Sequence, residues 1–122
     1  MKTLTKLLTL LVVLLLTLTA YQAISYAHYS LYDYDNYNCS HMSRDLEKYL
    51  EFIGFDVKIM VGIYSQSNTG HMWIKVYNVH IDSVTLYPFD PTNNDYDYIK
   101  EYESFIDASK EITYLRIRWR SR

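Results

Sequence analysis

The longest uninterrupted pattern in this chain is an apolar run near its start. Two lysines precede an almost purely apolar stretch from Leu7 to Leu18, and small residues follow at Ser25 and Ala27. A basic start, a short apolar run and then small residues form the order of a secretory signal. Because the run is shorter than the roughly 20 residues that span a bilayer, we expect a cleaved signal peptide over residues 1–27, with the mature chain starting at His28. An uncleaved membrane anchor, with the same domain outside, is the alternative.

The middle of the chain changes from helical to alternating periodicity. Apolar residues recur at helical spacing from Ser40 to Ile53, and Gly54 follows where a helix would end. Apolar and polar residues alternate over 55–64, which predicts a strand. A second alternating stretch over 71–87 predicts a hairpin that turns near Asn78.

The last third predicts turns, a helix and a strand. Residues 89–95 carry turn-forming side chains, a second helix is expected from about Tyr96 to Lys110, and residues 112–120 read as a closing strand. The pattern therefore predicts an α+β fold with a helix, an antiparallel sheet of three or four strands and a second helix.

Length and composition narrow the classes of protein. Without residues 1–27, the 122 residues leave 95, which suits a single domain over 28–122. Many of the 14 tyrosines lie in 28–38, which favours an extended arm over the core or, alternatively, a linker from the membrane. The formal net charge is −2 and the basic residues are scattered except over 116–122, so nucleic acid is not an expected partner. We interpret that arginine cluster as a solvated strand end rather than a contact to an anionic surface.

The chain has one cysteine, Cys39. Small exported domains normally pair their cysteines, so a lone thiol is a buried bystander, half of an intermolecular disulfide or a reactive group. Cys39 falls at the start of the predicted helix, where unpaired N–H groups and the helix dipole favour a thiolate. This position makes Cys39 a candidate nucleophile.

A histidine and an aspartate of the predicted hairpin are candidates for the groups that would activate such a thiol. A turn at residues 77–78 places Trp73 opposite Asp82, and Trp73 shares a face of its strand with His71. Asp82 is then diagonal to His71 and within reach of its imidazole. Asp90 is the rival acid, but it requires the chain to fold back.

A zinc site is the competing interpretation of the same side chains. Cys39, His41, His71 and His80 are possible zinc ligands. One intervening residue at a helix start points the first two side chains in different directions. We therefore expect neither a metal nor another cofactor, and we expect His41 and His80 to be surface residues.

The order of these motifs resembles the transglutaminase-like branch of the papain-like cysteine enzymes. The segments NCS, GHMWIKV and then HID or PFDPT, within residues 39–92, are similar to the family's helix-start Cys, its His-x-Trp strand and its following Asp, often in Asp-Pro-Thr. The resemblance implies a papain-like core in which the helix that carries the Cys packs on a small antiparallel sheet. It also implies that Cys39 is the nucleophile, His71 the base and Asp82 the orienting acid. Asp90 is the rival because Asp-Pro-Thr begins there.

The resemblance implies an exported hydrolase that cleaves amides through an acyl-thioester. Its substrates would be peptides or proteins of a cell wall or cell surface, and we expect a peptidase or isopeptidase rather than a cross-linking acyltransferase because water is abundant outside the cell. Candidates for oxyanion or substrate contacts are Tyr37, Asn38 and Trp73, beside the backbone N–H of Cys39. The alternative is a non-catalytic exported surface-binding module in which tyrosines and tryptophans form the contact surface.

Overall fold

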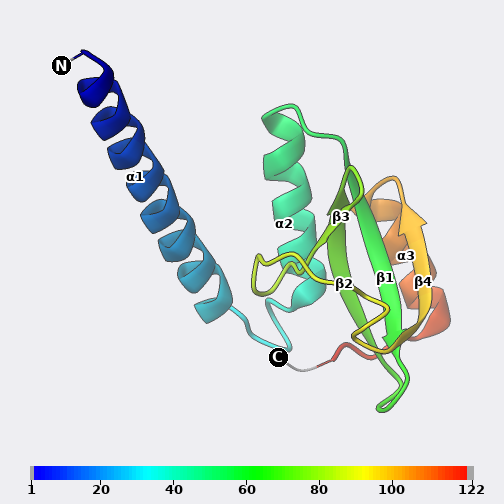
Figure 1. Cartoon of the computed structure of the whole chain (residues 1–122). Coiled ribbons are helices and arrows are strands. Elements are labelled where there is room, and N and C mark those ends of the chain that lie inside the picture. The colour runs from blue at the N-terminus through cyan, green and yellow to red at the C-terminus, as the bar shows by residue number, and fades with distance from the viewer. Residues whose placement is uncertain (1, 121–122) are drawn as a thin grey trace.

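The computed structural model describes residues 2–120, which form three helices and four strands (Figure 1). The helices and strands follow one another as α1 (Lys2–Ser30), α2 (Cys39–Phe52), β1 (Val57–Tyr64), β2 (Thr69–Val76), β3 (Val79–Ile81), β4 (Tyr96–Tyr102) and α3 (Phe105–Leu115). The fold is α+β, as the sequence predicts.

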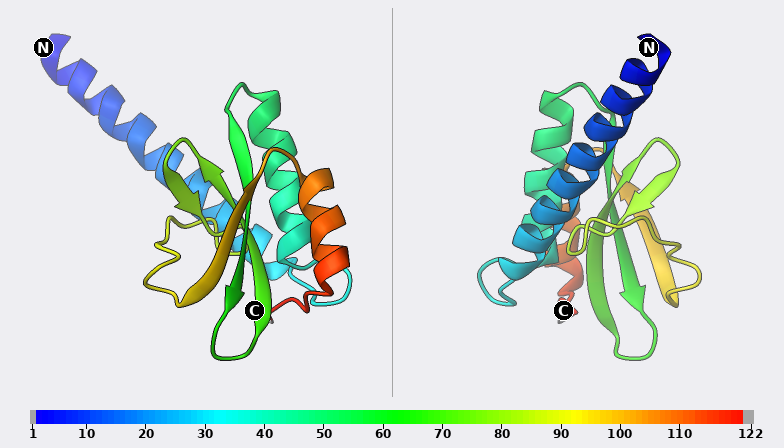
Figure 2. Two further views of the ribbon diagram at one scale, coloured as in Figure 1. Left: turned by 90° about the vertical axis from the view of Figure 1, so that its right-hand side faces the viewer. Right: turned by 60° about the vertical axis from the view of Figure 1, so that its left-hand side comes forward.

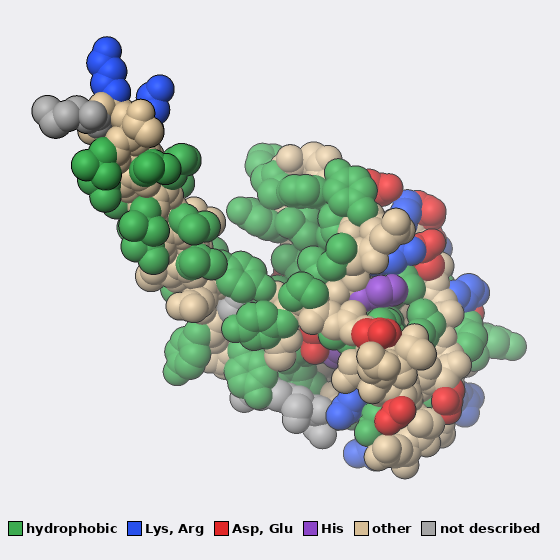
Figure 3. All heavy atoms as spheres, in the orientation of Figure 1, with side chains coloured by type: hydrophobic (Ala, Val, Ile, Leu, Met, Phe, Trp, Pro, Cys, Tyr) green, Lys and Arg blue, Asp and Glu red, His purple; other side chains and the backbone are tan. Residues whose placement is uncertain are grey.

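Most of helix α1 projects from the packed domain with an exposed apolar surface, and Tyr21 in its second half contacts Leu86 and Tyr87. Lys2–Ile24 is long and apolar enough to cross a membrane, and none of it is buried in the protein. Figure 3 shows its hydrophobic side chains projecting on the visible side. Such a helix is compatible with a signal sequence or an anchor, and so with an extracytoplasmic location.

The tyrosine-rich segment after the apolar run differs from the expected extended arm. Residues 28–30 continue α1, and the chain then turns, with one antiparallel bridge between Asp33 and Tyr37. Each of these two residues donates its N–H to the other's carbonyl. Local hydrogen bonding therefore makes part of the predicted arm a compact turn.

The four strands form one antiparallel sheet in the order β3-β2-β1-β4. Val76 pairs with Val79, so the β2–β3 hairpin turns at residues 77–78 as predicted. Figure 2 shows α2 and α3 side by side on one face of the sheet. Alternate residues of the central strands point to these helices, and they form the core with Met42 of α2 and Ala108 and Ile112 of α3.

The other face of the sheet carries an aromatic cluster. Trp73 lies on this face and is completely buried against Phe89 and Tyr96, with ring centroids 5.2 Å away in each case. A Cβ at Gly62 would come within 2.8 Å of the Trp73 ring, so the indole requires glycine at this position of β1. His71 lies on the same face, next to this cluster.

The last third of the chain corrects two sequence predictions. The expected helix from Tyr96 to Lys110 begins instead as strand β4, and α3 starts only after Ser104, whose side chain accepts a hydrogen bond from the Asp107 N–H. Residues 112–115 belong to α3 and not to a closing strand. Beyond α3, residues 116–120 make a single parallel bridge, from Trp119 to Gly70. The Ser104 cap and the pairing of β4 with β1 outweigh the helical spacing.

Candidate active site

The candidate nucleophile is the first residue of α2. Asn38 caps this helix, accepting a 3.0 Å hydrogen bond from the Ser40 N–H, and His41 completes a capping box by accepting from the Asn38 N–H. As the first helical residue, Cys39 has a backbone N–H without an intrahelical acceptor. The thiol therefore sits where the helix offers donors to negative charge.

Ser83 joins the start of α2 to the sheet. Its hydroxyl lies 2.7 Å from the carbonyl oxygen of Met72 and 3.2 Å from that of Cys39. The Ser43 hydroxyl donates a further bond, of 2.7 Å, to the Cys39 carbonyl. These buried contacts fix the first turn of α2 against β2, the strand that carries His71.

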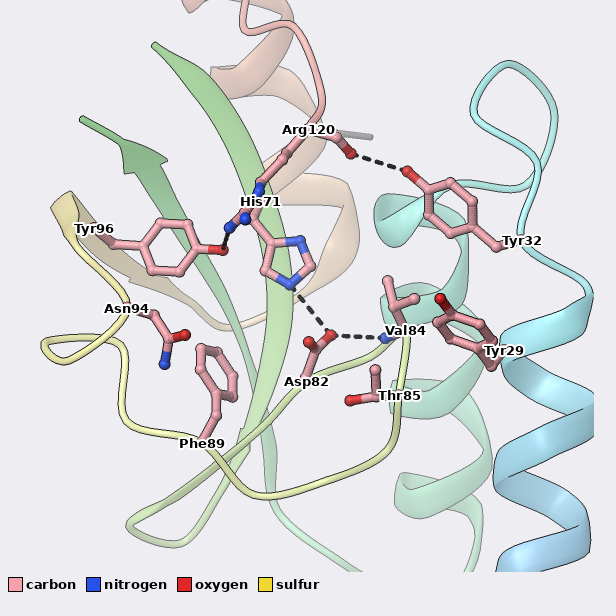
Figure 4. Close-up of a pocket in the computed structure, with 10 residues that line it drawn as sticks. All are labelled: Tyr29, Tyr32, His71, Asp82, Val84, Thr85, Phe89, Asn94, Tyr96 and Arg120. Atoms are coloured by element: carbon pink, nitrogen blue, oxygen red, sulfur yellow. Dashed lines mark hydrogen bonds and ion pairs between the residues drawn. The ribbon is translucent and has the colours of Figure 1, made fainter. Parts of the chain in front are cut away.

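His71 contacts both the acid and the thiol. Its Nε2 lies 3.2 Å from Asp82 Oδ1, and the same oxygen accepts a 2.8 Å hydrogen bond from the Val84 N–H (Figure 4). The Cys39 side chain also lies within hydrogen-bonding reach of the His71 side chain. Since Asp82 occupies Nε2, the ring nitrogen left for the thiol is Nδ1. The structure thus brings the three predicted side chains together in the order thiol, imidazole, carboxylate.

The charges in this row favour the ionised forms of His71 and Asp82. Burial lowers the pKa of His71, but the negative charge and hydrogen bond of Cys39 and the hydrogen bond to Asp82 outweigh it and raise that pKa to about 9. Burial likewise raises the pKa of Asp82, but its hydrogen bond to His71 and the imidazolium charge leave it below its usual value. An imidazolium is therefore the expected form of His71 at neutral pH, and it is the form that pairs with a thiolate.

A cavity of about 290 Å³ opens beside the imidazole. Its lining includes His71, Asp82, Phe89, Tyr96 and Arg120, as Figure 4 shows. The Cys39 side chain has no exposed surface and does not line this cavity. The thiol is therefore next to the cavity but covered.

A hydrogen bond links the tyrosine-rich segment to the C-terminal segment at this cavity. The Tyr32 hydroxyl donates to the carbonyl oxygen of Arg120 at 2.9 Å, and both residues line the cavity (Figure 4). No pattern in the sequence marked Tyr32, Tyr96 or Arg120 as site residues. The arginine cluster was a visible signal, but nothing in the sequence indicated which arginine turns to the site.

Four other predicted residues lie outside the row. Asp90 is exposed and accepts from the Thr92 N–H at 2.9 Å, so Asp82 and not Asp90 meets His71. Trp73 is completely buried, so it packs beside His71 and offers no surface to a substrate. Asn38 caps α2, and Tyr37 donates its hydroxyl to Asp45.

Local hydrogen bonds engage Tyr37 and Asn38 away from the row. The Tyr37 N–H donates to the Asp33 carbonyl at 2.7 Å, and the Asn38 amide donates to the Tyr34 carbonyl at 3.0 Å. The backbone N–H of Cys39 remains the oxyanion candidate.

The two other central histidines have structural contacts and are partly buried, not fully exposed surface residues. His41 belongs to the capping box of α2, and His80 accepts a 2.9 Å hydrogen bond from the Trp73 indole. Over residues 2–120, no three His, Cys, Asp or Glu side chains converge as a metal site.

Comparisons with known proteins leave this geometry as the basis for assigning a function. No family model, curated protein or solved structure matches the chain.

Proposed function

We propose that this protein is an exported, cysteine-dependent hydrolase of the transglutaminase-like, papain-like kind. The observation that carries the proposal is the row of Cys39, His71 and Asp82, in which the thiol starts a helix and the imidazole bonds a carboxylate on its far side. A nucleophile, its base and a group that orients the base make up the minimal equipment for acyl transfer. The proposed core has α2 packed on the central strands.

Each residue has a defined role in the proposed reaction. The Cys39 thiolate attacks the carbonyl carbon of an amide, the S–C bond forms, and the C–N bond breaks as the His71 imidazolium gives its proton to the leaving amine. Water then attacks the thioester, His71 takes its proton, and the acid and the thiolate are released. Asp82 keeps the imidazole oriented and does not change its own protonation.

The proposed substrates are peptides or proteins outside the cell. The apolar helix α1 supports an exported or membrane-anchored protein, and extracellular water favours hydrolysis of the thioester over transfer to an amine. Peptide or isopeptide bonds of wall polymers or surface proteins are the amides that such a location offers.

The complete burial of Cys39 makes a movement necessary for catalysis. A substrate carbonyl reaches the sulfur only if the cover opens, and the Tyr32–Arg120 hydrogen bond joins two segments that line the neighbouring cavity. The same burial favours the second candidate function, a non-catalytic exported binding module whose thiol is a core residue.

Thiol alkylation separates these two functions. The rate of reaction with iodoacetamide at pH 7 is measured for the wild type and for His71→Ala and His80→Ala, with unfolding curves to confirm that each variant is folded. We expect His71→Ala to slow alkylation at least about 100-fold, because the thiolate loses its imidazolium partner. His80→Ala is the matched control, since His80 is on the same hairpin but its ring bonds the Trp73 indole and not a thiol or a carboxylate.

Equal rates in the wild type and His71→Ala would contradict the enzyme and support the binding module. Slow alkylation of the wild type that becomes fast only on unfolding would have the same meaning.

A further inference from the structure

The cavity beside His71 contains a cation that the proposed reaction does not use. The segment after α3 runs along the start of β2: the Gly70 N–H donates to the Arg118 carbonyl, and the Arg120 N–H donates to the Gly70 carbonyl, both at 2.7 Å. Gly70 directly precedes His71. These two bonds therefore place the Arg120 backbone beside the strand position that carries the imidazole.

Gly70 is what allows this approach. A Cβ at this position would overlap Cγ2 of Ile117, which packs against the core. With a hydrogen atom there instead, the C-terminal segment lies directly on β2. Glycine at position 70 therefore allows the backbone pairing that positions Arg120.

Two tyrosines hold the Arg120 side chain. Its Nη1 donates to the Tyr96 hydroxyl at 3.3 Å, and its guanidinium carbon lies 4.2 Å from the centre of the Tyr64 ring. The Tyr96 ring in turn stacks on His71, with centroids 5.9 Å apart. Figure 4 shows the guanidinium next to the imidazole at one side of the cavity.

Among the described residues, the held guanidinium has no anionic partner. Among residues 2–120, no carboxylate lies within 4.0 Å of the Arg120 nitrogens, and the one acid that lines the cavity, Asp82, bonds His71. A guanidinium offers five N–H donors in a planar fork that matches a carboxylate. The only hydrogen bond from this guanidinium among those residues goes to a neutral hydroxyl.

We propose that Arg120 is a specificity residue that binds a carboxylate of the substrate, close to the amide that Cys39 attacks. The inference rests on the proposed function and adds to it a substrate class: peptides that carry a free carboxylate next to the cleaved bond. An imidazolium at His71 adds positive charge to the same side of the cavity. In this proposal, the substrate supplies the carboxylate that pairs with the Arg120 guanidinium.

A pair of matched alkylating probes tests this charge preference. Iodoacetate and iodoacetamide deliver the same carbon to the thiol and differ in carrying a carboxylate or a neutral amide. The measured quantity is the ratio of their rates with the wild type, Arg120→Gln, Arg120→Lys and Arg118→Gln. A change in the opening of the cover alters both rates together, so the ratio isolates the charge.

We expect Arg120→Gln to lower the iodoacetate-to-iodoacetamide ratio about fivefold, the effect of removing one charge a few ångströms from the carboxylate in a partly solvated cavity. Arg120→Lys should keep most of the ratio, which also shows that a loss in Arg120→Gln is not a folding defect. Arg118, which is exposed and bonds the Tyr34 hydroxyl, is the control, and Arg118→Gln should leave the ratio unchanged. Added salt should reduce the difference between the wild type and Arg120→Gln.

An equal ratio in the wild type and Arg120→Gln would overturn the carboxylate site. If alkylation still depended on His71, the proposed hydrolase would stand without the carboxylate site. Alkylation independent of His71 would overturn both the hydrolase and the carboxylate site.

Discussion

His71 and His80 lie on one hairpin and both contact Trp73 and Phe89, yet their polar partners differ. His71 stacks on the indole ring, bonds Asp82 and meets the Cys39 thiol. His80 accepts the indole N–H, and beside it a hollow of about 690 Å³ is lined by Lys75 and Asp90. The difference teaches that an imidazole becomes a candidate base through its partners and not through its position in a motif.

The two rings have opposite electrostatic environments. The thiol and Asp82 raise the pKa of His71 to about 9 despite its burial, whereas burial and the charge of Lys75 lower the pKa of His80. Two identical side chains a few residues apart are therefore expected in different protonation states at neutral pH.

The largest expected effect is the gap between these two pKa values. Histidine ring resonances followed from pH 4 to 10 should show His71 titrating near 9 and His80 below its ordinary value, a difference of more than about 300-fold in proton affinity. Cys39→Ser should move the His71 pKa down and leave that of His80 in place. Similar pKa values for both rings would show that the thiol does not act on His71.

Stability should follow pH in opposite directions for the two histidines. A raised folded-state pKa means that the stability from protonated His71 is complete below about pH 6.5 and is lost as the pH rises to about 9, by up to about 3 kcal/mol. His80 has a lowered pKa, so its contribution is present above about pH 6.5 and is lost at lower pH. Urea unfolding at pH 5, 6.5 and 9.5, with His71→Gln and His80→Gln, measures both terms. A wild type that gains stability between pH 6.5 and 9 relative to His71→Gln would reverse the expected sign.

The acids near the two histidines should differ by about tenfold in their effect on the thiol. Asp82→Asn removes the charge that orients and stabilises the His71 imidazolium, so iodoacetamide alkylation at pH 7 should slow about tenfold. Asp90→Asn should change the rate less than twofold, because Asp90 bonds the Thr92 N–H. The reverse order of effects would identify Asp90 as the functional acid.

The smallest expected effect concerns the hydrogen bond that helps to cover the thiol. Tyr32→Phe removes the hydrogen bond to the Arg120 carbonyl, and alkylation of Cys39 should become about threefold faster because one bond of about 1 kcal/mol no longer holds the cover. Tyr77→Phe is the matched control, since this exposed side chain lies at the β2–β3 turn on the His80 side. An unchanged rate in Tyr32→Phe would mean that the thiol is reached by another route.

The local patterns predicted the central part of the fold well. The helical spacing before Gly54 gave nearly the observed bounds of α2, and the hairpin turn at residues 77–78 set the register that brings Asp82 to His71. Both features depend on short-range periodicity and on a two-residue turn, and these signals can be read from neighbouring residues in a single sequence.

The last third was misread because its contacts are long-range. Strand β4 is an edge strand that is mostly exposed, so it lacks the alternation that marks a half-buried strand, and its apolar residues also fit helical spacing. The position of Arg120 depends on pairing with Gly70, a partner 50 positions away by their numbers. No local pattern distinguishes Arg120 from Arg118, and only the backbone pairing separates their roles.

The contact between residues 118–120 and Gly70 has a practical consequence for work with this protein. Any group fused directly after residue 122 is attached within a few residues of the Arg120 guanidinium, which lines the cavity. An affinity tag there would lie close to the Tyr32–Arg120 hydrogen bond and to any incoming carboxylate, and a histidine-rich tag would add titrating groups of its own. Tags for kinetic work therefore belong away from residues 118–120.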